Sequence, residues 1–268
     1  MNRSKKYEYK KIWLNVPLSL DCGQAFRWEK KPDGSMHGVA YGQAVDIFDE
    51  GEKLVIIGAD KSDFEKIWKG YFDLDRDYEK ICRGFENDEA LAEAVSFCPG
   101  IRILKQEPWE ALCSFIISQN NNIPRIKGII SRLCENLGEN LGEGDFTFPS
   151  PEKILEAGEA GLAPLRAGFR TKYILDAAEK VADGTVDFAE TDKMNDGEAS
   201  LELQKIKGVG AKVAACTLLY GFGRVDCLPV DVWVKRILAE TYPDGLPECT
   251  EGVRGIAQQY LFHWRRNK

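Results

Sequence analysis

Two residues in the C-terminal part of the chain, Lys212 and Asp231, have the types and order needed for a reaction between an amine and a carboxylate. Lys212 follows the turn Gly208-Val-Gly210 and lies in the first turn of a helix expected over 211–221. A helix N-terminus carries partial positive charge, which favours the neutral amine over the ammonium. Because a neutral amine is a nucleophile, Lys212 is a candidate for covalent catalysis.

Asp231 follows Pro229 at the start of the next expected helix, 230–241, and the loop between the two helices would return it toward Lys212. An aspartate at this place also fits a simple N-cap, and the spacing leaves both interpretations open. An amine beside a carboxylate suits cleavage of an N-glycosidic bond. The carboxylate stabilises the positive charge that develops on the sugar, while the amine attacks C1′ and forms a Schiff base.

The turn before Lys212 belongs to a longer pattern, Leu203-x-x-Ile206-x-Gly208-x-Gly210-x-Lys212-x-Ala214. Two helices joined in this way have the spacing of a helix-hairpin-helix element, in which glycines let backbone N–H groups approach a phosphate. A Gly-x-Gly between helices is by itself often only a tight turn, but the surrounding apolar pattern favours DNA binding. The alternative for Lys212 is a phosphate contact or a solvated charge.

The composition excludes several other chemistries. The eight cysteines include no Cys-x-x-Cys pair, and the two histidines, His37 and His263, lie far apart in the sequence. The chain therefore carries no zinc or iron–sulfur pattern and no serine triad, and we expect buried thiols, no metal and no cofactor.

Charge and hydropathy bear on the partner and the compartment. The net charge of −7 argues weakly against a nucleic-acid partner, but the basic residues are grouped near Arg125, near Arg170 and at the C-terminus, apart from acidic spacers. No apolar run approaches the roughly 20 residues of a membrane helix, and the polar start is unlike a signal peptide. We expect a cytosolic protein that does not contact membranes.

The hydrophobic periodicity indicates an α+β fold with two domains, divided near residue 105. Short β-rich runs occur at 13–14, 26–28, 38–41, 44–48 and 54–57, which predicts a small antiparallel sheet in a domain spanning 1–105. Helical patterns then dominate the chain through the domain spanning 106–268. The expected helices are 62–72, 75–84, 88–97, 108–135, 151–158, 170–183, 196–206, 211–221, 230–241 and 249–264.

Five motifs in order resemble those of the helix-hairpin-helix DNA glycosylases, and within them the 8-oxoguanine DNA glycosylases that carry a lyase lysine. The motifs span nearly the whole chain: Gly23-Gln-Ala-Phe-Arg-Trp28, Asn120-Asn-Asn-Ile-Pro-Arg125-Ile, the segment Gly208 to Cys216, Pro229-Val-Asp231-Val, and Gly255-Ile-Ala-Gln258 to Phe262. The resemblance implies an N-terminal sheet domain packed on helical subdomains, with a pocket between them that takes a base flipped out of the duplex.

The resemblance also implies roles for individual residues. Lys212 would be the nucleophile and Asp231 its electrostatic partner. The Gly23 carbonyl oxygen would accept a hydrogen bond from N7–H of 8-oxoguanine, where guanine has a lone pair that this acceptor repels. Gln258 would recognise the Watson–Crick edge, with Phe262 and Cys216 on the two faces of the base. From their positions alone, the more common interpretation is a core residue for Phe262, a buried thiol for Cys216 and a turn for Gly23.

The resemblance assigns further residues to DNA contacts. The asparagine run is a poor helix former and predicts a break in the helical region 108–135, which would place Asn120 and Arg125 against the opposite cytosine. A polar interhelical turn is the alternative. Phe169 would be a wedge and Arg170 a second opposite-strand contact, and the remaining DNA-contact residues are Gly208, Gly210, Val213 and Trp233.

The chain departs from the family at three positions. The family commonly has tyrosine at Phe169, often histidine at Trp233, where a 5′-phosphate contact is made, and often aspartate at Ala215. Two other functions remain as alternatives: a monofunctional glycosylase for alkylated bases, which normally lacks a lysine at 212, and a noncatalytic DNA-binding module. We expect a monomer that acts on double-stranded DNA containing 8-oxoguanine, in the cytoplasm of a prokaryote or the nucleus of a eukaryote.

Overall fold

The computed structural model describes residues 4–268, and its first part is an antiparallel sheet of five strands in the order β1-β5-β4-β3-β2. The strands of this sheet are β1 (Lys6–Lys10), β2 (Trp28–Lys30), β3 (Met36–Ala40), β4 (Gln43–Glu50) and β5 (Lys53–Ile57). A second, two-stranded sheet pairs β6 (Asn140–Gly142) with β7 (Asp145–Phe146). The α+β class predicted from the sequence is confirmed.

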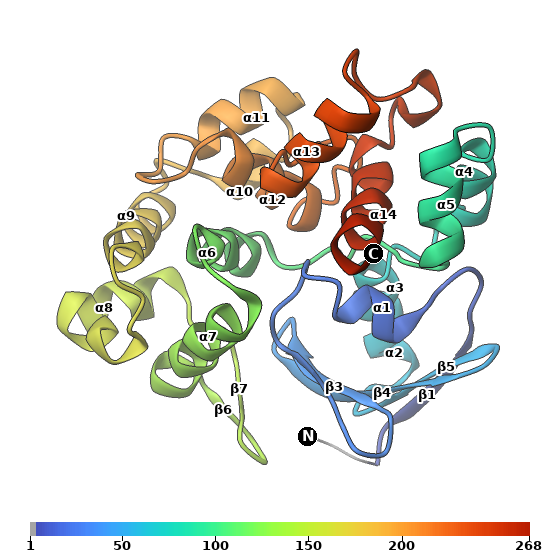
Figure 1. Cartoon of the computed structure of the whole chain (residues 1–268). Helices are drawn as coiled ribbons and strands as arrows, with labels where there is room; N and C mark the ends of the chain where they lie inside the picture. Colours follow the sequence, from blue (N-terminus) through green and yellow to red (C-terminus); the bar gives the residue numbers. More distant parts are fainter. Residues whose placement is uncertain (1–3) are drawn as a thin grey trace.

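Helices make up most of the rest of the described chain (Figure 1). Those in the first half are α1 (Val16–Leu20), α2 (Lys61–Asp63), the π-helical turn η1 (Phe64–Trp68), α3 (Lys69–Tyr71), α4 (Tyr78–Gly84), α5 (Glu89–Phe97), α6 (Pro108–Ser118) and α7 (Ile123–Leu137). Those in the second half are α8 (Pro151–Leu162), η2 (Ala163–Leu165), α9 (Arg170–Ala182), α10 (Phe188–Thr191), α11 (Asp196–Leu203), α12 (Ala211–Tyr220), α13 (Val232–Thr241), η3 (Glu248–Thr250) and α14 (Arg254–Asn267).

Alternation of side chains along the strands gives the sheet one buried face. Met36, Val45 and Ile47 point to the side covered by α1 and by the continuous helical segment α2-η1-α3, where Trp28 and Trp68 are also buried. The turn between β3 and β4 has two residues, Tyr41 and Gly42, both with positive φ. Such turns match the twist of an antiparallel hairpin, so this turn fixes the register of the sheet.

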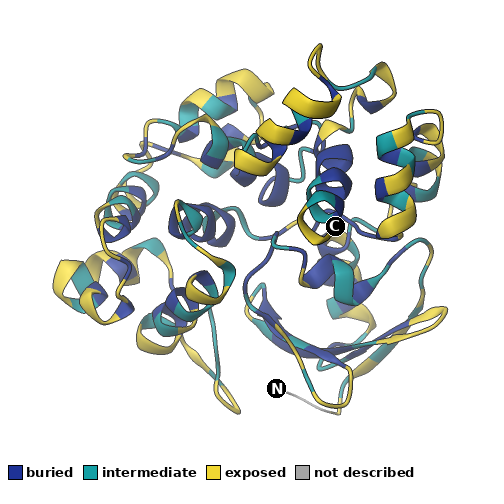
Figure 2. Cartoon of the chain, viewed as in Figure 1, coloured by how far each residue is buried: buried dark blue, intermediate teal, exposed yellow. Residues whose placement is uncertain are grey.

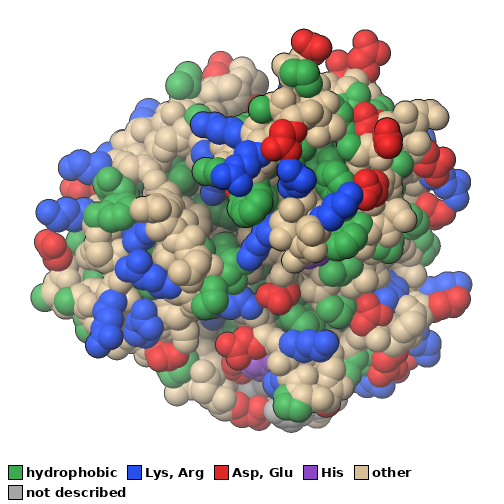
Figure 3. Space-filling view, viewed as in Figure 1, with side chains coloured by type: hydrophobic (Ala, Val, Ile, Leu, Met, Phe, Trp, Pro, Cys, Tyr) green, Lys and Arg blue, Asp and Glu red, His purple; other side chains and the backbone are tan. Residues whose placement is uncertain are grey.

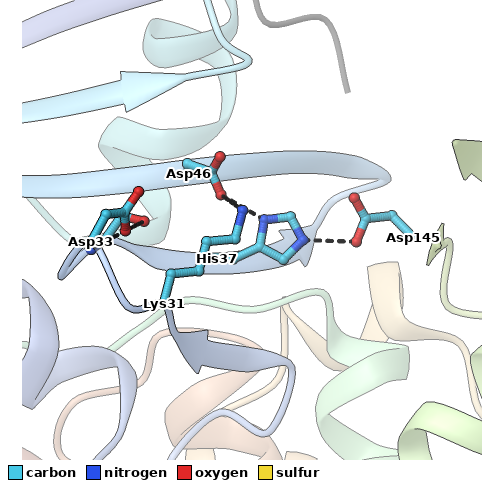
Figure 4. Close-up of polar contacts among 6 residues, drawn as sticks. Lys31, Asp33, His37, Asp46 and Asp145 are labelled. Atoms are coloured by element: carbon cyan, nitrogen blue, oxygen red, sulfur yellow. Dashed lines mark hydrogen bonds and ion pairs between the residues drawn. The ribbon is translucent and has the colours of Figure 1, made fainter. Parts of the chain in front are cut away.

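The other face of the sheet is joined to the helical part by a polar cluster around His37 (Figure 4). His37 on β3 lies opposite Asp46 on β4, and its Nδ1 atom is 2.7 Å from the Asp46 carboxylate. Its Nε2 atom is 2.8 Å from Asp145 on β7, while Lys31 donates to Asp46 at 2.6 Å. The histidine therefore ties the sheet to the β6–β7 hairpin.

Two buried clusters form the core. One lies between the five-stranded sheet and the helices α1 to α3. The larger one runs through the other helices, where buried residues concentrate in α6, α12 and α14 (Figure 2). Cys82 on α4 and Leu91 on α5 belong to the larger cluster, and α5 packs against α14. Packing thus brings part of the N-terminal segment onto the C-terminal helix, and the division near residue 105 stays a prediction.

Several local predictions need correction. Trp13 and Leu14 do not form a strand, because Trp13 has a positive φ of 47° and its indole donates to Tyr260. The edge strand β1 instead occupies residues 6–10, where no strand was expected. The short helices α1 and α10 and the β6–β7 hairpin were also missed. The expected break at the asparagine run is confirmed, since α6 ends at Ser118 and α7 begins at Ile123.

Candidate active site

Residues that are distant in the sequence meet around one cavity of about 60 Å³. The cavity is lined by Gly23, Phe115, Lys212, Cys216, Tyr220, Pro229, Asp231, Gln258, Gln259 and Phe262. It therefore brings together all the residues that the sequence assigned to catalysis or base recognition. Four segments contribute to it: the loop before β2, α6, the α12–α13 region and α14.

The hairpin between α11 and α12 places Lys212 at the edge of this cavity. Gly208 has a positive φ of 79°, and a Cβ atom there would lie 2.3 Å from the ring of Tyr173. Gly210 is the N-cap of α12 and has an extended backbone with no atom within 4 Å of an added Cβ. Only Gly208 is thus required as glycine by its own geometry. Val213, another predicted DNA-contact residue, is 3% exposed.

Lys212 is half-buried and lies between an aromatic ring and a thiol. Its Nζ atom is 5.4 Å from the centroid of the Phe115 ring. It also forms a hydrogen bond with Cys216, one helical turn further along α12. Burial raises the pKa of the Cys216 thiol to about 11, against the opposing effect of Lys212, so this thiol stays neutral. Within residues 4–268 no carboxylate forms an ion pair with Lys212.

Asp231 lines the cavity and is also the N-cap of α13. Its Oδ1 atom accepts a hydrogen bond from the backbone N–H of Val234 at 2.8 Å. The cap fixes the position of the carboxylate relative to the start of α13. The capping role that the sequence left open is therefore present, and it is compatible with an electrostatic role in the cavity.

Gly23 sits in a loop that buried polar contacts hold in place. Its φ is 92°, a conformation that favours glycine, and an added Cβ would lie 3.5 Å from Ile123 and 3.9 Å from Phe262. The neighbouring Gln24 is fully buried and donates to the carbonyl oxygens of Ser19 at 2.9 Å and Arg102 at 2.7 Å. Gln24 therefore fixes the loop in which Gly23 lines the cavity.

The recognition helix predicted near the C-terminus is α14. Gln258 is 5% exposed, and its Oε1 atom is buried without a hydrogen-bond partner among the described residues. Phe262 lies one turn further on, beside Arg266, whose guanidinium carbon is 5.9 Å from the ring centroid. Both side chains reach the cavity from the same face of the helix.

The asparagine turn between α6 and α7 lies next to the cavity, because Ile123 packs near Gly23. Asn120 is exposed and has a left-handed φ of 48°, which asparagine tolerates. Arg125 is exposed, and its guanidinium donates a long hydrogen bond of 3.5 Å to the Arg166 carbonyl oxygen. So weak a contact leaves the guanidinium available for another acceptor, and its contact with cytosine stays a prediction.

Arg170 has a structural role that the sequence did not suggest. It is 2% exposed and donates through Nε to the Gln119 carbonyl oxygen at 2.9 Å and through Nη2 to that of Asn120 at 2.9 Å. It therefore holds the asparagine turn, and a direct DNA contact by Arg170 stays a prediction. Phe169 beside it is 52% exposed, with Tyr173 packed edge-on at 5.7 Å.

The surface around these elements is asymmetric in charge. In Figure 3 the lysine and arginine side chains gather over the left and upper centre, whereas acidic side chains predominate at the right. Comparison with Figure 1 places the basic side over α7 to α9 and α13. Trp233, which is 39% exposed near the start of α13, stacks with Arg236 at 5.4 Å. The acidic net charge is thus compatible with a basic face.

Four residues that line the cavity were not predicted as site residues: Phe115, Tyr220, Pro229 and Gln259. Tyr220 continues the series of Lys212 and Cys216 at intervals of four residues on α12, so helical spacing contained a signal for it. Phe115 lies in an apolar helix, and nothing in its neighbourhood distinguishes it from the core. Gln259 was not predicted to line the cavity together with Gln258, because adjacent residues of a helix normally face different directions.

The chain matches two family models: the N-terminal domain of 8-oxoguanine DNA glycosylase over residues 6–112, and the HhH-GPD superfamily base excision DNA repair protein over residues 113–245. A relative named N-glycosylase/DNA lyase, from Saccharomyces cerevisiae, is 34% identical over 277 residues. This match covers 88% of this chain and 72% of that protein.

Solved structures of similar proteins support the same family. The 8-oxoguanine glycosylase/lyase of Clostridium acetobutylicum, in complex with double-stranded DNA containing cytosine opposite 8-oxoG, is 35% identical with a TM-score of 0.90, covering 100% of this chain and 99% of that one. MBOgg1 in complex with a low-affinity DNA ligand is 40% identical with a TM-score of 0.92, covering 98% and 96%. The resemblance found in the sequence is confirmed, and the chain belongs to the 8-oxoguanine DNA glycosylase family of the HhH-GPD superfamily of base excision DNA repair proteins.

Proposed function

We propose that this protein removes 8-oxoguanine from duplex DNA and then cleaves the strand at the resulting site through an imine on Lys212. The observation that carries the proposal is the single cavity in which Lys212, Asp231 and the base-recognition residues meet. Similarity to the N-glycosylase/DNA lyase of S. cerevisiae and to the 8-oxoguanine glycosylase/lyase of C. acetobutylicum supports both activities.

The reaction begins with the Lys212 amine. Its nitrogen forms a bond to C1′ as the N-glycosidic bond breaks, and the base leaves with the bonding electron pair and takes up a proton. The sugar ring opens as the nitrogen loses its protons and becomes an imine to C1′. Loss of a proton from C2′ then expels the 3′ phosphate, which cleaves the strand, and water hydrolyses the imine and restores the amine.

The carboxylate of Asp231 acts on the first of these steps. Positive charge develops on the sugar as the base departs, and a fixed carboxylate stabilises that charge more in the transition state than in the ground state. The cap to Val234 holds the carboxylate in place before the reaction, so no reorganisation is needed.

Recognition of the lesion rests on one hydrogen atom. 8-Oxoguanine carries a hydrogen on N7, whereas guanine has a lone pair there, so the Gly23 carbonyl oxygen attracts the lesion and repels the normal base. Gln24 holds this loop through buried hydrogen bonds, which limits its adjustment to the wrong base. Gln258 supplies an unpaired acceptor for the N1–H and amino group of the lesion.

The opposite strand is recognised by the asparagine turn and the start of α7. Arg125 offers paired donors to the O2 and N3 acceptors of an unpaired cytosine, and Asn120 assists it. Arg170 fixes the turn through hydrogen bonds to its backbone carbonyl oxygens. Phe169, whose side chain is exposed, enters the duplex as a wedge. The backbone around Gly208 and Gly210, together with Trp233, contacts phosphates.

We place the protein on double-stranded DNA as a monomer without a cofactor, in the cytoplasm if it is prokaryotic and in the nucleus if it is eukaryotic. The DNA substrate supports this assignment. Over residues 4–268 none of the helices combines the length and apolarity needed to span a bilayer.

The experiment that tests the proposal is incubation with a duplex carrying one 8-oxoguanine opposite cytosine, followed by denaturing electrophoresis. The proposal predicts strand cleavage without alkali and a covalent complex when borohydride is present. A matched duplex with guanine at the same position should remain intact. Cleavage only after alkali would indicate a monofunctional glycosylase, and binding without base loss would indicate a noncatalytic module.

A further inference from the structure

The cavity contains a polar pair that the proposed chemistry does not use. Tyr220 on α12 donates a hydrogen bond of 2.7 Å from its hydroxyl to Oε1 of Gln259 on α14. Both residues line the cavity, and they are 5% and 2% exposed. The Phe115 ring stacks on the Tyr220 ring with a centroid distance of 5.1 Å and an interplanar angle of 18°. The tyrosine is thus fixed from one side, and it fixes the glutamine in turn.

The orientation of the Gln259 amide follows from its partner. Burial raises the pKa of Tyr220 well above its usual value of 10, so the hydroxyl keeps its proton and acts as a donor. Over residues 4–268, Gln259 Oε1 is the only acceptor found for this hydroxyl. Turning the amide over would leave the buried hydroxyl hydrogen without an acceptor, which is costly. The amide nitrogen is therefore the group that Gln259 still has to offer.

That nitrogen is itself buried and has no hydrogen-bond partner among the described residues. The same is true of the Gln258 Oε1 atom on the neighbouring residue. Native proteins pair nearly all their buried polar atoms, so two unpaired atoms of opposite character in one ligand cavity indicate a ligand that completes both. One is a donor and the other is an acceptor.

We infer that Gln259, held by Tyr220, is a second specificity-determining residue of the base cavity, and that its amide N–H donates to O6 of the flipped guanine lesion. This inference rests on the proposed function, because it concerns the same cavity and the same substrate. A guanine-type edge presents N1–H as a donor beside O6 as an acceptor, which complements the Gln258 acceptor and the Gln259 donor.

An adenine-type edge has the opposite pattern. 8-Oxoadenine carries the same O8 atom and the same N7–H, but it has an amino donor at C6 and an unprotonated acceptor at N1. A donor on Gln259 would face the amino group and repel it. The pair thus discriminates between two oxidised purines that the Gly23 carbonyl group cannot distinguish, since both carry the N7 hydrogen.

The test is single-turnover excision of 8-oxoguanine and of 8-oxoadenine from otherwise identical duplexes, by the full chain and by Gln259→Glu. The glutamate keeps an acceptor for Tyr220 and replaces the donor by an acceptor. The wild type should prefer 8-oxoguanine, and the ratio of the two rates should fall at least about tenfold in the variant, since a site that loses a hydrogen-bond match discriminates much less. An unchanged ratio, or an equal loss on both substrates, would overturn the inference.

Tyr220→Phe provides an independent variant that leaves Gln259 in place. Without the hydrogen bond from the Tyr220 hydroxyl, the Gln259 amide can adopt both orientations. The ratio of the 8-oxoguanine rate to the 8-oxoadenine rate should then fall by about threefold to tenfold. The matched control is Tyr71→Phe, which removes a buried tyrosine hydroxyl that accepts from Trp28 at 2.6 Å outside the cavity. It should lower the melting temperature without changing the ratio. A fall of equal size in Tyr71→Phe would assign the effect to general destabilisation and overturn the inference.

Failure of the proposed function and failure of the Gln259 assignment give different results. A wild type that excises neither base contradicts the proposed function itself. A wild type that excises 8-oxoguanine and keeps its substrate ratio in both Gln259→Glu and Tyr220→Phe contradicts only the assignment of Gln259. Should Gln259→Glu not fold, as shown by its thermal unfolding, Tyr220→Phe decides the question on the same ratio.

Discussion

The Lys212 nitrogen lies 5.4 Å from the centroid of the Phe115 ring, on a surface formed by α6 and α12. An aromatic face attracts an ammonium more weakly than a buried carboxylate does, because only the ring quadrupole acts on the charge. The ring therefore contacts the amine at a place where no carboxylate among residues 4–268 forms an ion pair with it. This arrangement leaves the nitrogen at the edge of the cavity, where it can approach C1′ of a flipped nucleotide.

Asp231→Asn should lower the single-turnover rate of base excision by roughly tenfold to a thousandfold, because one electrostatic contribution to the transition state is lost. Asparagine still caps α13 through its side-chain oxygen, so the melting temperature should change little. The matched control is Asp77→Asn, which alters the cap of α4 at Lys80, outside the cavity. An excision rate equal to that of the wild type would leave Asp231 as a cap only.

Arg125→Ala should weaken the preference for cytosine opposite the lesion. We expect the wild type to favour cytosine by about 1 to 3 kcal/mol, the value of one good bidentate contact, and the variant to lose most of this preference. Single-turnover excision from duplexes with C, T, G or A opposite 8-oxoguanine measures it. Arg132→Ala on the same helix is the control, since its guanidinium is bonded to the Leu165 carbonyl oxygen. Equal wild-type rates on all four duplexes would remove Arg125 from the site.

Gly208→Ala should destabilise the protein by about 1 to 3 kcal/mol and weaken DNA binding, because the added Cβ meets the Tyr173 ring and the residue has a positive φ. Gly210→Ala two positions away is the matched control: its φ is −100° and its surroundings are open. Its free energy of unfolding in urea should fall less than that of Gly208→Ala, because only the N-cap preference for glycine over alanine is lost. Similar losses in both variants would contradict this description of the hairpin.

The cluster at His37 predicts a pH dependence of stability. Burial acts to raise the pKa of Asp46, but hydrogen bonds from Lys31 and His37 outweigh it and hold the pKa below its usual value of 3.8. A carboxyl with a lowered pKa stabilises the fold above the pKa of the unfolded chain, and this contribution disappears as the pH falls through the folded value.

The free energy of unfolding should therefore be higher for the wild type than for Asp46→Asn at pH 5, where the Asp46 carboxylate is charged. Below about pH 4 the difference should shrink. Urea unfolding at pH 7, 5 and 3 measures it. A difference of the same size at all three values would show that Asp46 does not act through its charge.

Much of the architecture followed from local patterns in the sequence. The hairpin glycines, the prolines at helix starts and the asparagine break act over a few residues, so the helices around Lys212 and Asp231 were predicted with nearly correct bounds. The edge strand β1 was missed although Lys-Tyr-Glu-Tyr-Lys alternates polar and aromatic residues, because it has no aliphatic residue and its two tyrosines are only half-buried where they pack on Phe64. The β6–β7 hairpin has little signal in the sequence, because its strands span only two or three residues within an acidic, glycine-rich segment.

The cavity itself depends on contacts that no local pattern contains. The loop of Gly23 is held by Gln24 through the backbone of residues as distant as Arg102, and Arg170 holds a turn 50 residues earlier in the chain. The pairing of Tyr220 with Gln259 likewise joins two helices. Such contacts arise only when the helices have packed, so the sequence identified these positions through family motifs or not at all.

The most direct test of the central claim is to locate the covalent bond. The enzyme is incubated with a duplex containing one 8-oxoguanine, trapped with borohydride and digested, and the modified peptide is identified by mass spectrometry. We predict a single adduct on Lys212, and no trapping or base release by Lys212→Gln, whose binding to the same duplex persists because the helix start is unchanged. An adduct on another residue, or full trapping by Lys212→Gln, would contradict the assignment of the nucleophile.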